Sequence, residues 1–395
     1  MRILISCGEP SGDLYAGALA AELRARVPDV QIAGLGGPRL AAAGATLTAD
    51  YSGMTVTGLT EALRVLPHSY ATYRRLVAAA RAERPDVFVA IDFPDFNFRL
   101  MRAMHRLGIP VVYYISPQLW AWRAGRMATM KRFVDKVLVI FPFEAAIYER
   151  AGVPVEFVGH PLVDLARATQ PRAAFLRDQG LQPDAPTVAL LPGSRPNELH
   201  RIAGDMAASL PLIRARIPDV QFVVAAAPGL PDALFAPFRG GPDKARPTGH
   251  VGRALSGAPT IVRDRTDDVL AASDVVITAS GTATVQAALH ERPMVVVYRL
   301  SPVTYLLGRR FVKVDTYAMA NLVAGRRIVP ELIQDEFTPQ RVAAEVLALL
   351  SDRDRYDTTR QALADVRRRL GAPGASARAA DAIIQICLRT HSAHS

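Results

Sequence analysis

The stretch DVFVAIDFPDFN, residues 86–97, decides the fold and holds the candidate chemistry. It opens with five apolar residues, 87–91, and three of them are β-branched. Such a run is typical of a parallel strand that is buried on both faces. Asp92 follows directly, at the carboxyl end of the strand, where open α/β sheets bind their ligands. Pro94 disfavours helical geometry at Phe93, so we expect Asp92 to lie on a constrained turn that faces a crevice.

The two aspartates of this stretch need separate interpretations, because either can serve as a turn or cap residue. For Asp95 an N-cap is the favoured interpretation, since it stands where the next helix is expected to begin. For Asp92 we favour a functional role, for reasons that come from the rest of the chain.

The order strand, loop, helix repeats along most of the chain. Alternation of this kind predicts parallel sheets with helices on both faces. The expected strands of the first half are 2–6, 30–35, 87–91, 111–115, 136–141 and 155–158. Those of the second half are 187–191, 220–226, 260–262, 275–279 and 294–298. After Pro339 the pattern is entirely helical.

A chain of 395 residues is long enough for two domains. A linker-like segment at 163–186 separates the two alternating series. We therefore predict an α/β protein with two doubly wound, Rossmann-like domains facing a cleft. The expected parts are an N-terminal catalytic domain at 1–165, a nucleotide-binding domain at 166–345, and C-terminal helices at 346–395. Those helices either pack back on the first domain or are exchanged in a dimer.

The composition narrows the class of protein and of partner. The two cysteines, Cys7 and Cys387, stand at opposite ends and give no disulfide framework, which favours a reducing compartment. No signal segment is recognisable, and no apolar run reaches the ~18 residues that span a bilayer. The net charge of +10 favours phosphates or anionic lipid surfaces as partners. Nucleic acid is the least favoured anionic partner, because the chain lacks a basic tail, zinc spacing and RNA-binding aromatics.

The first loop, CGEPSGD at 7–13, does not have the G-x-G-x-x-G spacing of a dinucleotide site, which argues against NAD. Gly8 and Gly12 would let the backbone approach a ligand, and Glu9 suggests a group aimed at one. An ordinary turn from strand to helix explains the loop equally well.

Two strand ends in the second half resemble phosphate sites. In LLPGSR, 190–195, Gly193 and Ser194 can present backbone N–H groups, and Arg195 adds a cation suited to bidentate binding.

The second loop is ASGTAT at 279–284, which places small polar residues at the start of a helix, where the dipole favours an anion. These residues are Ser280, Gly281, Thr282 and Thr284. Two such loops at one sheet edge predict a diphosphate site. No acidic pair suited to Mg²⁺ accompanies them, so we expect no metal.

Two further segments have a structural and a functional interpretation. In SPQLWAWR, 116–123, Trp120 and Trp122 either staple the fold or wall a sugar or lipid pocket. At 56–77, apolar residues recur at helical spacing beside several arginines, as in a core-facing amphipathic helix or an acyl-binding surface element. The apolar residues concerned are Val56, Leu59, Leu63 and Leu66.

Taken together, the motifs resemble bacterial lipid-A-disaccharide synthase over essentially the whole chain. The segments that carry the resemblance are GEPSGD 8–13, IDFPDFN 91–97, SPQLWAWR 116–123, FPFE 141–144, VGHPLVD 158–164, LPGSR 191–195, ASGTA 279–283 and NLVAGR 321–326. The resemblance implies a GT-B glycosyltransferase that inverts the anomeric configuration and works without metal or other cofactor. It implies transfer of 2,3-diacylglucosamine from its UDP conjugate to 2,3-diacylglucosamine 1-phosphate, giving a β-1,6 disaccharide 1-phosphate and UDP. The family is cytoplasmic and peripheral to the inner membrane, and members form dimers with exchanged C-terminal parts.

The resemblance also implies roles for individual residues. Asp92 matches the family's essential aspartate and would be the base, and Glu9 matches an acidic residue near the acceptor. Arg195 and the two loops would hold the diphosphate, and Asn321 matches a position at the nucleotide end of the cleft. Support on the acceptor side is expected from Ser11, Asp95, Asn97, Trp120, Trp122 and Arg123. Residues 56–66 would meet acyl chains.

One position departs from the family pattern. Many members carry Glu where this chain has Gln286, and a carboxylate there can accept both ribose hydroxyls. An amide binds a diol less strongly than a charged acceptor does, so the departure bears on donor affinity.

Two other functions stay open from the residues. One is a different enzyme of the same architecture, such as a UDP-N-acetylglucosamine 2-epimerase or a transferase for another lipid-linked sugar. An epimerase has no use for an exposed apolar surface at 59–66. The other is a sugar-nucleotide binding protein without activity, which would not need a carboxylate at position 92.

Overall fold

The structure, a computed structural model, describes residues 1–54, 59–117, 125–239, 257–300 and 316–392, with the side chains of 59–64 and 390–392 outside the description. It forms two compact units. Unit 1 comprises Met1–Asp164 and Leu370–Ser395, and unit 2 comprises Leu165–Arg369. The boundary between Asp164 and Leu165 lies beside the domain boundary that the sequence predicted at 165. The expected C-terminal part, 346–395, is shared between the units rather than forming a third body.

Within the described residues, unit 1 is built on a seven-stranded sheet in which every pairing is parallel. The strand order is β3 (Thr46–Asp50), β2 (Gln31–Gly36), β1 (Arg2–Ser6), β4 (Val87–Ile91), β5 (Val111–Tyr114), β6 (Lys136–Val139) and β7 (Val155–Phe157). The chain therefore builds outward from β1 in both directions. The reversal falls between β1 and β4, the kind of switch point at which doubly wound sheets bind ligands.

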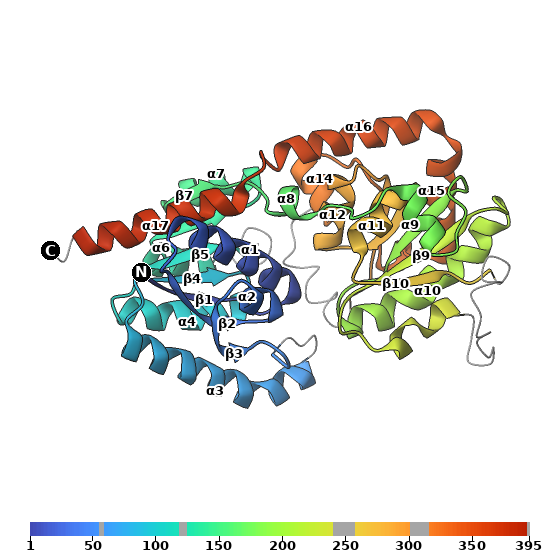
Figure 1. The fold of residues 1–395 in the computed structure, drawn as a ribbon. Helices are drawn as coiled ribbons and strands as arrows, with labels where there is room; N and C mark the ends of the chain where they lie inside the picture. The colour runs from blue at the N-terminus through green and yellow to red at the C-terminus, as the bar shows by residue number, and fades with distance from the viewer. Residues whose placement is uncertain (55–58, 118–124, 240–256, 301–315, 393–395) are drawn as a thin grey trace. The chain divides into compact units, whose positions relative to one another are not determined.

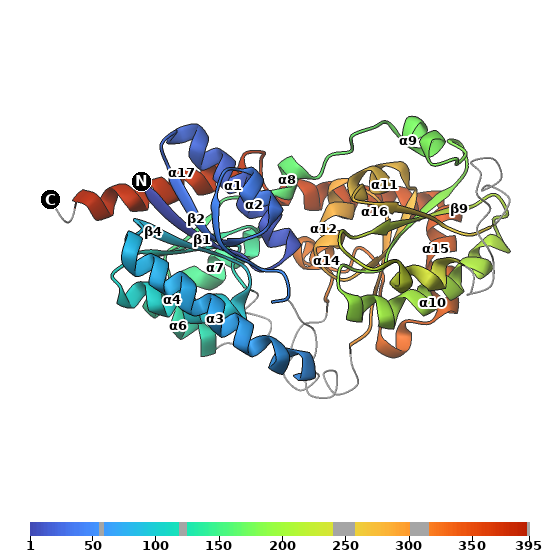
Figure 2. The ribbon, with the colours of Figure 1, turned by 60° about the horizontal axis from the view of Figure 1, so that its bottom comes forward.

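Helices cover both faces of this sheet (Figures 1 and 2). On one face lie α1 (Pro10–Arg26), α2 (Pro38–Ala42) and α17 (Ala375–Ser392). The other face carries α3 (Leu59–Glu83), α4 (Pro94–Arg106) and α6 (Gly125–Phe133). Two further helices are α7 (Pro142–Arg150) and the short α8 (Leu162–Leu165). All five residues of β4 are buried, as a strand covered on both faces requires.

Unit 2 repeats the plan with a six-stranded parallel sheet in its described residues. The order is β10 (Thr260–Arg263), β9 (Gln221–Ala226), β8 (Thr187–Leu191), β11 (Val275–Ala279), β12 (Met294–Tyr298) and β13 (Glu331–Ile333). The helices are α9 (Arg172–Asp178), α10 (Pro196–Arg214), α11 (Thr266–Ala272), α12 (Thr282–Leu289), α14 (Met319–Ala324), α15 (Pro339–Ser351) and α16 (Arg353–Arg369), with 3₁₀ segments η1 (Asp232–Arg239) and η3 (Gln334–Glu336). Two doubly wound α/β units confirm the predicted fold class.

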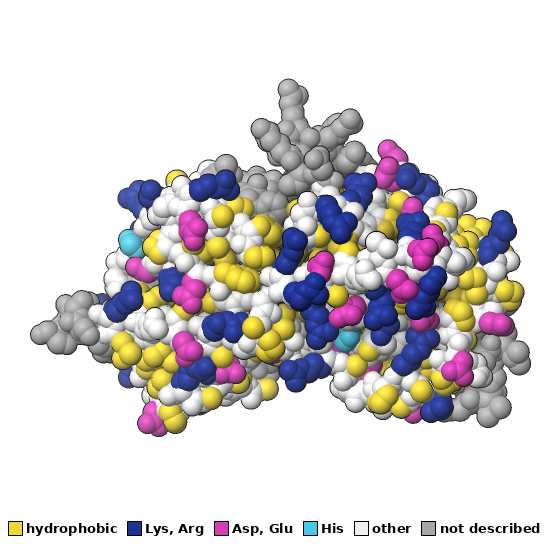
Figure 3. All heavy atoms as spheres, turned by 90° about the horizontal axis from the view of Figure 1, so that it is seen from above, with side chains coloured by type: hydrophobic (Ala, Val, Ile, Leu, Met, Phe, Trp, Pro, Cys, Tyr) yellow, Lys and Arg dark blue, Asp and Glu magenta, His cyan; other side chains and the backbone are white. Residues whose placement is uncertain are grey.

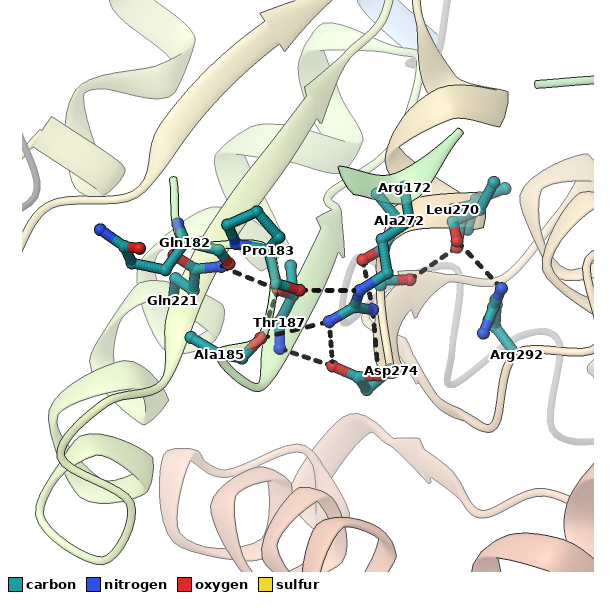
Figure 4. Close-up of polar contacts among 12 residues, drawn as sticks. Arg172, Gln182, Pro183, Ala185, Thr187, Gln221, Leu270, Ala272, Asp274 and Arg292 are labelled. Atoms are coloured by element: carbon teal, nitrogen blue, oxygen red, sulfur yellow. Dashed lines mark hydrogen bonds and ion pairs between the residues drawn. The ribbon is translucent and has the colours of Figure 1, made fainter. Parts of the chain in front are cut away.

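One arginine fixes the amino-terminal edge of this sheet. Figure 4 shows the guanidinium of Arg172 bonded to both carboxylate oxygens of Asp274, at 3.0 and 2.9 Å. It also donates to the backbone carbonyls of Pro183, Ala185 and Ala272. Because Asp274 also accepts from the backbone of Thr187, where β8 begins, Arg172 joins the linker to the starts of β8 and β11.

The last helix returns to unit 1 at the segment VGHPLVD, 158–164. Arg378 of α17 donates to the carbonyl of Val158 at 2.8 Å, and the N–H of Gly374 donates to Asp164 at 2.8 Å. Gly159 has φ +84°, and a Cβ there would lie 2.8 Å from the Arg378 guanidinium. The glycine of this motif therefore makes room for the arginine that anchors α17.

Apart from shifts of one or two residues at strand ends, the observed elements differ from the predicted ones chiefly in four places. The sequence pattern missed β3, which is only partly buried, and β13, which has three residues. The first helix begins at Pro10, inside the segment expected to be a loop, because proline suits the first helical position. The sequence at 50–84 predicts one or two helices with an interruption at Pro67, since proline disfavours a helix interior, but α3 runs continuously through Pro67.

Candidate functional site

The switch point of unit 1 brings the first loop and the DFPDFN segment together. Ser6 of β1 pairs with Ala90 of β4, so the two strands end side by side. Gly8 lies against the ring of Phe93, and a Cβ on Gly8 would come within 2.2 Å of that ring. The glycine is therefore needed for close packing. The structure brings the partly buried Glu9 and Asp92 to the same edge of the sheet.

Asp92 lies on a strained turn. Its φ is +45° and that of Phe93 is +48°, so both residues are left-handed, a conformation uncommon outside glycine. Phe93 lies outside right-handed helical geometry, as the following proline led us to expect, and it is the left-handed N-cap of α4. The turn itself agrees with the prediction for Asp92.

Two side chains hold this turn. The carbonyl of Asp92 accepts hydrogen bonds from Asn97 Nδ2 and from the Tyr113 hydroxyl, both at 2.8 Å. Burial, and then the Asp92 carboxylate, raise the pKa of Tyr113 well above its ordinary value, so the phenol stays a donor. Strain of this kind persists only where surrounding contacts over-determine it.

Asn97, which the resemblance assigns to support on the acceptor side, ties the two strand ends together. Its Oδ1 accepts from the Ser6 hydroxyl at 2.7 Å, and its Nδ2 also faces the Ser6 carbonyl at 3.2 Å. The side chain is fully buried. Asn97 is therefore a positioning residue for Asp92, and its position in the fold does not suit contact with an acceptor.

Other predicted residues of unit 1 are placed differently. Asp95 is not the N-cap, because α4 begins at Pro94 and Asp95 lies inside its first turn. Its exposed carboxylate forms an ion pair with Arg126 at 2.6 Å. Ser11 is half-buried in the first turn of α1. Trp120, Trp122, Arg123 and Val56 lie outside the described residues, as do the side chains of Leu59 and Leu63.

The first loop holds a structural residue that the sequence did not reveal. Asp13 is 1% exposed, and its carboxylate accepts from the backbone N–H groups of Gly37, Arg39 and Leu40. It therefore caps the start of α2 from a distance of 24 residues or more along the chain. No local pattern indicates a cap donated from so far away.

In unit 2 the two phosphate-like loops also lie side by side. Leu191 of β8 pairs with Thr278 of β11, so the loops after these strands leave the sheet edge together. One loop leads into α10 and the other into α12. Two helix N-termini at one switch point form the electropositive edge that a diphosphate needs.

Glu198 belongs to this region and was missed. Its carboxylate accepts from the Ser194 N–H and from Arg195, each at 3.2 Å. Gly193 has φ +122°, and a Cβ there would lie 2.7 Å from Glu198 Oε2. No capping box marks Glu198 in the sequence, because the N-cap of α10 is Arg195 and the N–H that Glu198 accepts belongs to Ser194.

One residue of the loop before α12 has a backbone conformation that favours glycine. Gly281 has φ +150°, which favours glycine, while Thr282 is exposed at the first helical position. Ser280 donates to the carbonyl of Tyr317 at 3.3 Å. Thr284 donates to the carbonyl of Gly281 at 2.7 Å and is buried, so its hydroxyl supports the turn instead of facing an anion.

Asn321 needs a corrected role. It is 1% exposed, and its amide donates to Val329 and Glu331 and accepts from the N–H groups of Ile328 and Val329. These bonds use the full capacity of an amide side chain. Asn321 therefore positions the backbone around α14 and has no polar atom left for a nucleotide.

The comparisons with known proteins cover the whole of both units. The family model described as lipid-A-disaccharide synthetase matches residues 3–386. The lipid-A-disaccharide synthase of Myxococcus xanthus is 43% identical over 387 residues, covering 98% of this chain and 97% of its own. That of Geobacter sulfurreducens is 42% identical over 389 residues, with the same coverage.

This chain belongs to the lipid-A-disaccharide synthase family. It is a glycosyltransferase of lipid A biosynthesis. A UDP-GlcNAc 2-epimerase structure from Neisseria meningitidis, solved with UDP-GlcNAc, has a TM-score of 0.67 over 98% of this chain at 12% identity. The glycosyltransferase of kitacinnamycin has a TM-score of 0.62 at 21% identity. At such identities the structures show the shared GT-B fold alone.

Two surface observations bear on how a lipid-A-disaccharide synthase meets its lipids. On α3, Leu66 and Tyr70 are 46% and 62% exposed, one turn apart, with Arg74 and Arg75 following. Figure 3 shows one face of the molecule, on which Lys and Arg side chains are spread among Asp and Glu. In the described part of the chain, no helix has the length and apolarity needed to cross a membrane.

Proposed function

We propose that this family member transfers 2,3-diacylglucosamine from its UDP conjugate to 2,3-diacylglucosamine 1-phosphate, lipid X. The products are the β-1,6-linked disaccharide 1-phosphate and UDP. The observation that carries the proposal is Asp92, held on a strained turn at the switch point of unit 1. Membership in the family supports the substrate class, and the two helix N-termini of unit 2 support a diphosphate leaving group.

Asp92 acts as general base in this scheme. Its carboxylate takes the proton of the acceptor's 6-hydroxyl as that oxygen attacks the anomeric carbon of the donor. The bond from the anomeric carbon to the β-phosphate oxygen breaks, and its electron pair leaves with UDP. Attack from the opposite side inverts the anomeric configuration. Glu9, at the same sheet edge, is placed to orient the acceptor.

The leaving UDP is stabilised by groups of unit 2. The N–H groups at Gly193 and Thr282 supply positive potential for the diphosphate. The Ser194 N–H and the Arg195 guanidinium are paired with Glu198, and we propose that they exchange this carboxylate for the phosphates when UDP binds. Because no metal is needed where backbone and arginine neutralise the charge, we propose that transfer is metal-independent. A chelator added to the assay should leave turnover unchanged.

The acceptor and donor carry acyl chains, and we propose that the α3 surface meets them at the inner membrane. Leu66 and Tyr70 offer apolar area, while Arg74 and Arg75 suit anionic head groups. This gives a peripheral enzyme on the cytoplasmic side. A homodimer with exchanged C-terminal parts is compatible with an α17 that joins unit 1 from the far end of the chain.

The test is turnover of the two acylated substrates in detergent by the Asp92→Asn variant. We expect transfer to fall by about 10²–10⁴-fold, the usual contribution of a general base, while UDP binding by calorimetry is kept. Asp95→Asn is the matched comparison, because that carboxylate is exposed and paired with Arg126. Turnover like the wild type in Asp92→Asn would remove Asp92 from the mechanism. An epimerase would instead interconvert UDP-N-acetylglucosamine with no lipid acceptor present.

A further inference from the structure

The carboxylate of Asp267, on the first turn of α11, lies beside α12. The Oδ1 atom of Asp267 lies 2.9 Å from His290 Nε2. Its two oxygens lie 3.4 and 3.5 Å from Gln286 Nε2. Gln286 and His290 follow Thr282 at intervals of four residues and share its side of the helix. Asp267 therefore faces the strip of α12 that begins at the expected phosphate site.

The neighbouring Asp268 shows what a purely structural acid looks like in this segment. Its side chain is 2% exposed, and it accepts bonds of 2.6–3.1 Å from Thr169, Gln170 and Arg265. Although burial alone raises the pKa of Asp268, the bonds from Arg265 and Thr169 lower it overall. These contacts tie the linker to α11.

Asp267 differs from Asp268 both in the exposure of its side chain and in its hydrogen-bond partners. Its side chain is 23% exposed. Among the described residues, His290 is its one partner at ordinary hydrogen-bond length, since the contacts to Gln286 are long. A carboxylate has about four acceptor sites, so Asp267 keeps acceptor capacity on its exposed side.

The position of this carboxylate suits the sugar of a nucleotide. Four residues separate Thr282 from Gln286, which is ~6 Å along a helix. In a nucleoside diphosphate the ribose follows the α-phosphate directly and carries two adjacent hydroxyls. A ligand whose phosphates lie at the start of α12 therefore brings its diol toward the next turn.

We propose that Asp267 accepts hydrogen bonds from the ribose hydroxyls of the UDP moiety, with Gln286 beside it and His290 holding it in place. This inference rests on the proposed function and extends it to a residue of α11. It also explains why an amide is tolerated at position 286. A glutamate there would place two carboxylates about 3.5 Å apart, and like charges at that separation repel.

The experiment compares UDP with 2′,3′-dideoxy-UDP, by calorimetry on the full-length chain. We expect the wild type to prefer UDP by about 10–100-fold, because hydroxyl bonds to a charged acceptor are lost in the analogue. Asp267→Asn should reduce this preference to about threefold or less, because a neutral acceptor binds hydroxyls more weakly. The control is Asp268→Asn, which should lower stability and keep the preference.

An exchange of the two side chains sharpens the test. Gln286→Glu alone should weaken UDP binding, because it adds a like charge next to Asp267. Gln286→Glu combined with Asp267→Asn again supplies one carboxylate and one amide, and should restore the preference for UDP.

The outcomes separate this inference from the proposed function. Failure of the wild-type chain to bind UDP would overturn the proposed function itself. UDP binding with an unchanged preference in Asp267→Asn, or an equal loss for both nucleotides, would overturn the role of Asp267 alone.

Discussion

The proposed chemistry depends on Asp92, and the geometry of this residue comes from partners far away in the sequence. The strand pattern at 87–91 and the proline at 94 were enough to predict a turn at Asp92. They could not predict its support, because Ser6 and Asn97 are 91 residues apart and meet only in the folded sheet. The structural role of Asn321 was not foreseen either. Its partners Ile328, Val329 and Glu331 stand seven to ten residues away, on the segment before β13 and at the start of that strand, and no local pattern links them to Asn321.

Removing one support of the Asp92 turn should affect catalysis more than binding. In Tyr113→Phe the carbonyl of Asp92 loses one of its two side-chain donors. We expect a several-fold lower kcat with little change in KM, and a loss of about 1–2 kcal/mol in the free energy of unfolding. Steady-state kinetics with both acylated substrates gives the split between kcat and KM. Tyr70→Phe, which alters an exposed phenol, is the control. Equal changes in kcat and KM would contradict a positioning role.

His160 gives unit 1 a dependence on pH. Burial lowers its pKa to about 3, and its Nδ1 accepts from the Leu162 N–H at 3.1 Å. At pH values between this pKa and the ordinary histidine pKa of ~6.5, His160 binds a proton in the unfolded chain but not in the folded chain. The free energy of unfolding therefore falls as the pH falls through this window. We expect a loss of ~2 kcal/mol from this group between pH 7 and pH 5.

The check is thermal unfolding of wild type and His160→Asn at both pH values. The asparagine keeps an acceptor for Leu162 but does not titrate. The variant should therefore lose less stability on acidification than the wild type does. Equal losses in the two proteins would show that other groups set the dependence.

At the scale of elements, the central strands were predicted well, whereas two of the four edge strands of the described sheets, β3 and β13, were missed. The strands β4, β8 and β11 are continuous apolar runs, and their observed bounds equal the predicted ones. The missed strand β3 has the sequence TLTAD and is only partly buried at the sheet edge, so its alternation is weak. The second missed strand, β13, has three residues, and its Glu331 is buried by contacts with Tyr317, Ala318 and Asn321. Neither sequence offers the apolar run on which the prediction depended.

The turn before α12 offers a test of the diphosphate site at this scale. Gly281 has φ +150° and no atom within 4 Å of an added Cβ, so a substitution there introduces backbone strain without a clash. Gly281→Ala should cost about 1–2 kcal/mol through that strain. If the turn shifts to relieve it, UDP affinity should fall about tenfold.

The comparison for this variant is Gly204→Ala, in the middle of α10, where an added Cβ also has open space but the backbone is helical. That change should slightly stabilise the helix. Unchanged UDP affinity in a folded Gly281→Ala protein would argue against an anion site at the start of α12.

For the whole molecule, the sequence predicted two doubly wound units and the edges at which their candidate groups gather. For the helix at 56–77 it left two interpretations open, a core-facing amphipathic helix or an acyl-binding surface element, and of the four apolar candidates only Leu66 has a described side chain. Leu66 and Tyr70 are exposed, as a surface element requires. The division of the C-terminal helices between the units could not be predicted, because helical periodicity shows which face is buried and not which partner covers it.

The α3 surface leads to a prediction about membranes. Leu66→Ser combined with Tyr70→Ser should weaken binding to vesicles that contain anionic lipid, by about thirtyfold if each side chain contributes ~1 kcal/mol of apolar burial. Co-sedimentation with vesicles measures this loss. Thermal unfolding should be unchanged, since both side chains are exposed.

Leu212→Ser is the matched control, because Leu212 is 39% exposed on α10 of unit 2. It should leave vesicle binding as in the wild type. Equal losses in the two sets of variants would assign membrane binding to general hydrophobicity and not to α3.

The return of α17 to unit 1 has a consequence for how the protein is made. Unit 2 is inserted into unit 1, so translation completes unit 2 before the ribosome has produced Leu370–Ser395. Until then α1 lacks the helix that covers it, including the buried contacts of Ala379, Ile383 and Cys387. The nascent chain must therefore leave this face of unit 1 uncovered until α17 has been made. A chain that stops before α17 would have a complete second unit and an unfinished first one.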